Sequence, residues 1–302
     1  MKTESVLVTG GTGFIGRHLT RALAVSGQHP VVCGRHPIDI ELDGAGARFL
    51  MMDITDGESV HAAFEAVKPT RVFHVAGTSK VDGLSVNTIG TERLLAEVMR
   101  SKVERVVLLG SAEEYGALSG PISEHLPAAP RSPYGVSKAA ATQLARRAHA
   151  EHGCPAVVVR PFTVYGPWQP LEVFVAEAVA CAVENKAFLM STGTQRRDHV
   201  YVDDVVRALI AASTAPGIDG EVINVGSGVA TPLREVAETI WRLTETSAPL
   251  HIGVRPAAPH EQNDAWADIG LAEQALGWSP TVDLEDGLLA TIEWAREQRG
   301  QA

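Results

Sequence analysis

The sequence of 302 residues has few cysteines, few aromatic residues and fewer basic than acidic side chains. Cys33, Cys154 and Cys181 are far apart and form no Cys-x-x-Cys pair, which argues against a disulfide framework or a zinc site and favours a reducing, cytoplasmic location. The net charge of -10 disfavours nucleic acid and anionic membranes as partners. No apolar run approaches the ~20 residues that cross a bilayer. The first strand begins so early that we expect no signal peptide.

What the sequence does contain is a regular alternation of strands and helices. Apolar runs at 6–8, 31–33, 48–52, 71–75 and 105–109 are separated by amphipathic stretches of helical length. This order predicts an α/β fold of the Rossmann type, with a doubly wound parallel sheet covered on both faces. Beyond residue 165 the pattern changes. We expect a dinucleotide-binding domain of residues 1–165 and 199–228, and a smaller discontinuous substrate domain of residues 166–198 and 229–302, with the ligand in the cleft between them.

The first strand is followed at once by the segment Thr-Gly-Gly-Thr-Gly-Phe-Ile-Gly at 9–16. Gly10, Gly13 and Gly16 are spaced so that the backbone can approach a pyrophosphate at the positive end of a helix that starts near Gly13. Glycine turns also open helices for purely steric reasons, so the spacing alone is a weak signal. Its place between a strand and a helix favours a nucleotide site that includes Phe14 and Ile15.

The loop after the second strand indicates which cofactor the protein prefers. Units that bind NAD place an acidic residue here, whereas this chain has Arg35, which suits the 2′-phosphate of NADP(H). NADP is therefore the preferred cofactor and NAD the alternative, with Arg35 then a solvated residue and Asp39 or Glu41 holding the ribose. The ends of the third and fourth strands, where the cofactor would pass, complete the expected cofactor site: Asp53, Ile54, Ala76 and Gly77.

Three side chains near the fifth strand predict proton transfer beside a hydride carrier. Ser111 follows that strand, and Tyr134 and Lys138 lie four residues apart on one face of an alanine-rich helix. A phenol is a poor proton carrier near its ordinary pKa of about 10. An ammonium group one turn away would favour the phenolate, and Ser111 could hydrogen-bond the same substrate oxygen. Ser111, Tyr134 and Lys138 are the predicted catalytic residues, and the last two would also contact the cofactor.

Together these motifs resemble the extended short-chain dehydrogenase/reductases, in the branch that acts on nucleotide-diphosphate sugars, the epimerase/dehydratase family. His-Val-Ala-Gly at 74–77, Asn87, Arg-Pro-Phe-Thr-Val-Tyr-Gly-Pro at 160–167 and Arg-Asp-His-Val-Tyr-Val-Asp-Asp at 197–204 carry the same resemblance. The segments 110–116 and 132–138 are most similar to GDP-4-keto-6-deoxy-mannose reductases. That resemblance implies hydride transfer from NADPH to the C4 ketone of a nucleotide-diphosphate 4-keto-6-deoxy sugar, with Tyr134 protonating the alkoxide.

The resemblance also implies a set of substrate contacts and a quaternary structure. Arg197 and Arg255 would clamp the diphosphate, and Thr163 stands where many relatives have an asparagine beside the nucleotide phosphate. Relatives form homodimers through the helices near 87–101 and 134–152. The implied substrate-binding residues are Thr78, Glu113, Thr163, Arg197 and Arg255.

Two alternatives stay open. The first is a 4,6-dehydratase or 4-epimerase that retains its cofactor, because a glutamate matching Glu113 removes the C5 proton in GDP-mannose dehydratases. The Asp-Glu pair usual in TDP-sugar dehydratases is here Ala112-Glu113. The second alternative is a non-catalytic NADP(H) sensor, which the intact triad disfavours. His149 and His152 lack the HExxH order, so we expect no metal site.

Overall fold

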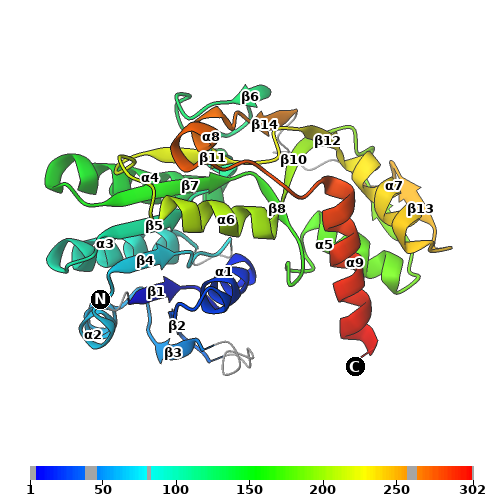
Figure 1. The fold of residues 1–302 in the computed structure, drawn as a ribbon. Coiled ribbons are helices and arrows are strands. Elements are labelled where there is room, and N and C mark those ends of the chain that lie inside the picture. Colours follow the sequence, from blue (N-terminus) through cyan, green and yellow to red (C-terminus); the bar gives the residue numbers. More distant parts are fainter. Residues whose placement is uncertain (1–4, 38–45, 80–82, 257–263, 301–302) are drawn as a thin grey trace.

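A parallel sheet of seven strands forms the centre of the computed structural model, which describes residues 5–37, 46–79, 83–256 and 264–300 (Figure 1). The fold class that the sequence predicts is confirmed. Four of these apolar runs form buried strands, because both faces of the sheet are covered, whereas the edge strand at 48–51 is partly exposed. The strands across the sheet are β11 (Val222–Val225), β7 (Ala156–Pro161), β5 (Arg105–Leu109), β4 (Arg71–His74), β1 (Val6–Thr9), β2 (Val31–Gly34) and β3 (Arg48–Met51).

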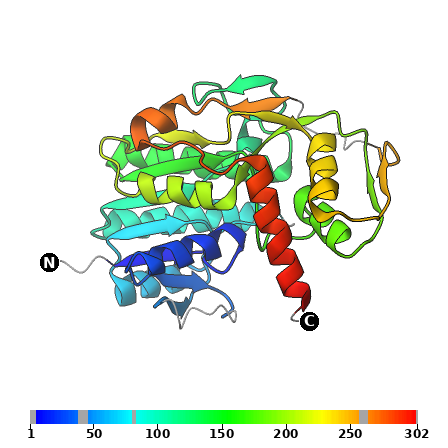
Figure 2. The ribbon, with the colours of Figure 1, turned by 45° about the vertical axis from the view of Figure 1, so that its right-hand side comes forward.

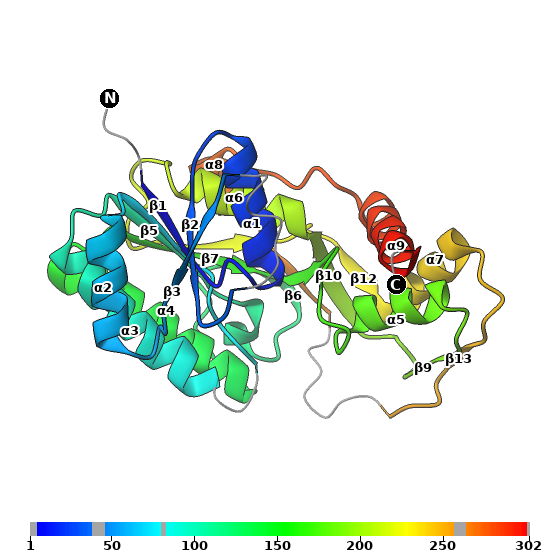
Figure 3. The ribbon, with the colours of Figure 1, turned by 90° about the horizontal axis from the view of Figure 1, so that it is seen from below.

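Helices cover the two faces of this sheet in two separate layers (Figure 3). One apolar core lies under α2 (Gly57–Val67), α3 (Gly90–Arg100) and α4 (Pro133–His152). The other lies under α1 (Phe14–Val25), α6 (Val202–Ala212) and α8 (Gly270–Leu276). The strand order reverses direction at β1, where β2 lies on one side and β4 on the other. Open α/β sheets bind ligands outside the carboxyl ends of their strands at such a point.

Beyond the sheet, a second group of elements packs around its own core (Figure 2). A second sheet has five strands: β12 (Ala230–Pro232), β10 (Arg196–Tyr201), β14 (Ala265–Ala267), β6 (Gly120–Ile122) and β8 (Thr163–Tyr165), the last paired with β10. A two-stranded ribbon joins β9 (Phe188–Met190) and β13 (Leu250–Ile252). Three helices share an apolar core: α5 (Phe174–Val183), α7 (Leu233–Thr244) and α9 (Leu284–Gly300). Within the described ranges, no helix combines the length and the apolar character needed to cross a membrane.

Two short elements cross the domain boundaries that the sequence predicts. Strand β6 lies in the range 1–165 but pairs with β14 in the second sheet. Helix α8 lies in the range 229–302, yet Ala272 belongs to the core of the large sheet. The division into a cofactor domain and a substrate domain stays a prediction.

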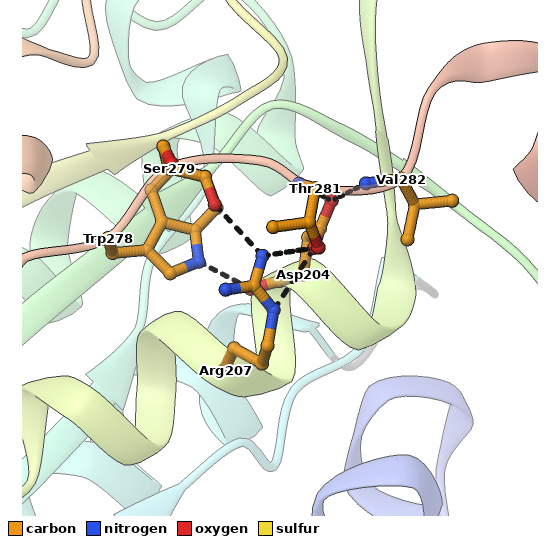
Figure 4. A network of polar contacts seen from close by, with 6 residues as sticks. All are labelled: Asp204, Arg207, Trp278, Ser279, Thr281 and Val282. Carbon is orange, nitrogen blue, oxygen red and sulfur yellow. Dashed lines mark hydrogen bonds and ion pairs between the residues drawn. The ribbon is translucent and has the colours of Figure 1, made fainter.

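A buried carboxylate fastens the chain before α9 to helix α6 (Figure 4). Asp204 accepts hydrogen bonds from the backbone N–H groups of Thr281 and Val282, at 3.0 and 3.1 Å, and from the Thr281 hydroxyl at 2.9 Å. The Trp278 indole donates to the Asp204 carbonyl at 2.9 Å. Arg207 contacts the same carboxylate and donates to the Ser279 carbonyl at 2.9 Å. These bonds connect helix α6, which covers the large sheet, to the segment that leads into helix α9.

We predict that Asp204→Ala lowers the free energy of unfolding by about 3 kcal/mol, because buried N–H groups lose their acceptor and Arg207 loses its counter-charge. Urea unfolding measures this change. The control is Glu238→Ala, which removes a surface pair with Arg234 and should cost under about 1 kcal/mol. Equal effects of the two substitutions would contradict the anchoring role of Asp204 in the network of Figure 4.

Candidate functional site

The glycine turn after β1 brings backbone against backbone. Gly10 has a positive φ of 69°, and a Cβ atom there would lie 2.5 Å from the Ala76 Cα atom. A Cβ atom at Gly16 would lie 2.0 Å from the Gly10 carbonyl oxygen. Helix α1 begins after Gly13 with no side-chain cap and no acidic residue in its first turn. Its first N–H groups therefore suit the anionic pyrophosphate of a dinucleotide, which fits this cradle.

Arg35 and Asp53 lie near each other beyond the ends of β2 and β3. Arg35 is exposed directly after Gly34. Asp53 accepts hydrogen bonds from the Thr55 N–H and hydroxyl at 2.8 and 2.7 Å, which lower its pKa, and the positive charge of Arg35 adds to this effect. The alternative ribose ligands Asp39 and Glu41 lie outside the described residues. Ile54 is buried beside Gly90 at the start of α3.

A neutral histidine links three elements under the predicted cofactor path. His74 Nδ1 lies 2.7 Å from the Thr9 hydroxyl, and His74 Nε2 lies 2.9 Å from the Thr91 hydroxyl. Thr91 in turn donates to the Asn87 carbonyl at 2.6 Å, so its oxygen accepts from a protonated Nε2. Complete burial lowers the pKa of His74 to about 3, with Lys138 adding a smaller effect. The imidazole is therefore uncharged at neutral pH.

Asn87 connects the turn after β4 to the helix that carries Tyr134. It lies in a π-helical turn, η1 (Ser85–Ile89), that leads into α3. Its side chain accepts from the Thr78 N–H at 3.0 Å and donates to the Thr78 carbonyl at 2.9 Å and the Ser137 hydroxyl at 2.8 Å. Ser137 donates to the Tyr134 carbonyl at 2.7 Å. The sequence pattern predicted no role of its own for Asn87, although this residue belongs to the motifs that carry the family resemblance.

The three predicted catalytic residues meet at the carboxyl end of β5. Ser111 begins a short 3-10 helix, η2 (Ala112–Tyr115), and its side chain hydrogen-bonds the Tyr134 phenol. Ser132 caps α4 by accepting from the Gly135 N–H at 3.0 Å, which fixes the turn that presents Tyr134. The Lys138 ammonium is buried, lies 5.9 Å from the centre of the Tyr134 ring and donates to the Leu109 carbonyl at 2.8 Å.

The expected lowering of the Tyr134 pKa is wrong for this structure. Burial, together with the negative charge of Glu113, raises the pKa of Tyr134 to about 12. The hydrogen bond from Ser111 opposes this shift. Burial lowers the pKa of Lys138 to about 8, while the charge of Glu114 opposes that shift. The sequence showed the ammonium group one turn away from the phenol. It did not show that Lys138 is buried, that Tyr134 is partly buried or that two carboxylates lie beside them.

A cavity of about 500 Å³ opens beside these residues, a size suited to a sugar nucleotide. Its wall joins the glycine turn, the end of β5, the start of α4 and strand β8. Glu113 faces it and accepts a hydrogen bond from Ser132. The predicted site residues in its wall are Phe14, Ile15, Ser111, Glu113, Tyr134, Thr163 and Arg197.

The other predicted substrate residues lie apart from this wall. Arg255 is half-exposed, with its guanidinium 3.4 Å from a carboxylate oxygen of Glu177 on α5. Thr78 is held by Asn87 at the turn after β4. Arg131 lines the cavity and was not predicted, because one arginine in a proline-rich loop carries no pattern. Across the described ranges no three His, Cys, Asp or Glu residues form a metal-binding group.

Three comparisons bear on this site. A model of the NAD dependent epimerase/dehydratase family matches residues 6–226. The chain is 29% identical to the UDP-glucuronate 4-epimerase of Thermodesulfobacterium geofontis, over 96% of each chain, and 29% identical to the dTDP-D-glucose 4,6-dehydratase of Bos taurus, over 97% and 89%. Its structure superposes on MoeE5 in complex with UDP-glucose and NAD with a TM-score of 0.89, at 31% identity over 99% and 100%.

The two relatives that are named by their activity are an epimerase and a dehydratase rather than reductases. They give no support to the specific reductase that the segments 110–116 and 132–138 suggest. The neighbouring structure contains NAD, so a preference for NADP is likewise without support from it. The broader expectation, of an NAD(P)-dependent enzyme of nucleotide-sugar chemistry, is confirmed.

The buried histidines predict a loss of stability in acid. His74 and His199 have pKa values of about 3 and about 4 in the folded chain against 6.5 ordinarily. Between these values the unfolded chain binds protons that the folded chain does not. The free energy of unfolding therefore falls as the pH is lowered, by up to about 1.4 kcal/mol per pH unit for each histidine.

We predict that His74→Asn flattens this dependence between about pH 6.5 and pH 4.5, even though the variant is less stable at neutral pH. Urea unfolding at several pH values measures the slope. His251→Asn, at an exposed position, is the control and should keep the slope of the unchanged chain. An equal slope in His74→Asn would show that His74 does not titrate as its burial requires.

Proposed function

This chain belongs to the NAD dependent epimerase/dehydratase family, and we propose that it is a 4-epimerase of a nucleotide-diphosphate sugar that keeps its nicotinamide cofactor bound between turnovers. The observation that carries the proposal is the wall of the cavity. Phe14 and Ile15 of the glycine turn lie in the same wall as Ser111 and Tyr134. A bound dinucleotide and a sugar would therefore meet beside a proton-transfer group.

The roles of the side chains follow from their positions. Tyr134 would take the proton of the sugar C4 hydroxyl as that carbon becomes a ketone, and return it after reduction from the opposite face. Ser111, which hydrogen-bonds the phenol, would hold the same substrate oxygen. Lys138 lies close enough to stabilise the phenolate form. When bound, the nicotinamide supplies the acceptor and donor of hydride. No proton or hydride is left over, so no second substrate is needed.

The side chains next to Ser111 distinguish epimerisation from dehydration. Loss of the C6 hydroxyl needs a base for the C5 proton and an acid for the departing hydroxyl. Glu113 faces the cavity and could serve as that base, which makes a 4,6-dehydratase the second candidate. Ala112, also in the wall, offers no acid. Epimerisation requires neither group and is the simpler use of this site.

Arg197 and Thr163 are the proposed contacts of the diphosphate, because both line the cavity at the side of β8 and β10. The role of Arg255 stays a prediction, since this side chain pairs with Glu177. A homodimer is proposed on the family resemblance together with apolar side chains exposed on η1, α3 and α4: Leu84, Ile89, Met99 and Val136. The cytoplasmic location rests on cysteine usage alone.

The test is incubation of the purified protein with a panel of UDP, TDP and GDP sugars in deuterated water. A 4-epimerase gives a product of unchanged mass, with no deuterium at carbon and no net change in nicotinamide absorbance. A dehydratase product lacks one water and carries deuterium from the solvent. Stoichiometric loss of NADPH with a 4-keto-6-deoxy sugar would instead establish a reductase and overturn the proposal. Tyr134→Phe should lower kcat by at least about a hundredfold in every case.

For the cofactor we propose that Arg35 permits NADP to bind, whereas NAD binds in the relative with a known complex. Arg35→Ala should weaken NADP binding roughly ten- to a hundredfold, the loss of one charge-assisted phosphate contact, and change NAD binding little. Calorimetric titration of both cofactors measures this. Arg21→Ala, exposed on α1, is the matched control. NADP binding that is unaffected by Arg35→Ala would contradict the proposed contact.

A further inference from the structure

A buried ion pair lies directly beneath Ser111. Glu114 in η2 is fully buried, Arg160 on β7 is almost fully buried, and their side chains meet at 2.6 Å. Ions are removed from water at a cost of several kcal/mol each, so a pair at this depth needs further hydrogen bonds to be tolerated. Both oxygens of the Glu114 carboxylate are in use. One accepts from Arg160 and the other accepts from the Ser111 N–H at 2.9 Å.

The contact with Ser111 is part of a reciprocal cap. The Ser111 hydroxyl accepts from the Glu113 N–H at 3.2 Å, while Glu114 holds the Ser111 N–H. A Cβ atom at Gly110 would lie 2.8 Å from the Glu114 oxygen, so the glycine leaves room for the carboxylate. The backbone of Ser111 is thus fixed from below by Glu114, on the side opposite to the cavity that its side chain lines.

Arg160 is itself held by neighbouring side chains, so the ion pair has a fixed position in the core. Its guanidinium lies 4.3 Å from the centre of the buried Tyr115 ring. The Tyr115 hydroxyl donates to the Asn224 side chain at 2.9 Å on β11. Asn224 donates from its backbone to Glu124 and from its side chain to the Ile122 carbonyl. Ser111 is therefore connected through Glu114 and Arg160 to strands of both sheets.

The Glu114 carboxylate also acts on the proton-transfer groups by its charge. It raises the pKa of Lys138, against the effect of burial, and raises the pKa of Tyr134. The charged groups that face it or its partner are Arg160, Lys138, Glu113 and Glu124. Glu114 thus favours the ammonium form of Lys138 and the neutral phenol form of Tyr134.

We propose that the Glu114–Arg160 pair is a positioning device for the active site: Glu114 fixes the backbone of Ser111 and places a negative charge behind Tyr134 and Lys138. The inference rests on the proposed C4 chemistry for its effect on turnover. A merely structural pair behaves differently, because a buried ion pair can be replaced by apolar residues of similar volume with little loss of stability.

The experiment uses the full chain with Glu114→Leu and Arg160→Met combined, which leaves no unpaired buried charge. We expect thermal stability near that of the unchanged protein and a kcat lower by about tenfold or more, since Ser111 loses its acceptor. Glu114→Gln with Arg160→Met restores an acceptor for the Ser111 N–H but not the negative charge, so it should recover only part of kcat. The control is Arg105→Met with Asp219→Ala, a pair at the other end of β5, which should keep kcat.

A second measurement is independent of any sugar or cofactor. The titration of Lys138 is followed by NMR on protein labelled at the lysine ε-carbon, with Lys138→Met as the assignment variant. We expect its pKa, about 8 in the unchanged chain, to fall in both double variants that lack Glu114. An unchanged kcat in the variant with Glu114→Leu and Arg160→Met, or an unchanged Lys138 titration, would overturn the inference. If no sugar is turned over by the unchanged protein, the proposed function fails and the Lys138 titration alone decides this inference.

Discussion

Backbone contact at the glycine turn is the constraint on which the site depends. Gly10 and Gly16 leave no space for a Cβ atom, so the turn lies against the end of β4 and α1 lies against the turn. The N-terminus of α1 is thereby held over the carboxyl edge of the sheet, where Phe14 and Ile15 enter the cavity wall. Helix α6 packs on α1 in the same layer, and Asp204 of α6 fastens the segment before α9. One close approach of backbone thus positions the cofactor cradle, and α6 beside it holds the segment before α9.

Two arginines line the cavity although the net charge of the chain is negative. For the proposed diphosphate of the substrate, a chain with a net charge of -10 offers Arg131 and Arg197 in the cavity wall. Two carboxylates, of Glu113 and Glu114, lie near Tyr134. Glu113 faces the cavity, whereas Glu114 is turned into the protein and neutralised by Arg160. Adjacent residues of one short helix therefore have different partners, one exposed to the ligand space and the other fixed in the core.

The sequence predicted those parts of the structure that rest on local pattern. Apolar runs that end in glycine or polar residues predict five of the seven strands, β1 to β5, and the spacing of Tyr134 and Lys138 predicts one helical face. Strand pairings between distant short segments have no such pattern, so the pairing of β6 with β14 and the position of α8 could not be foreseen. The environment of Tyr134 was also missed. Its high pKa arises from burial and from carboxylates whose directions only the fold sets.

The same arrangement explains why the chemistry of this family is hard to read from the triad alone. In the proposed reaction Ser111, Tyr134 and Lys138 would act on the proton of a C4 oxygen, and proton transfer at that oxygen accompanies oxidation and reduction alike. What separates an epimerase from a reductase is whether the cofactor leaves after each turnover. What separates either from a dehydratase is a second pair of groups at C5 and C6. Of that second pair the cavity wall holds Glu113, beside Ala112, which has no proton to give. The residues next to the triad, and the strength with which the glycine turn holds a dinucleotide, are therefore where we expect these reactions to diverge.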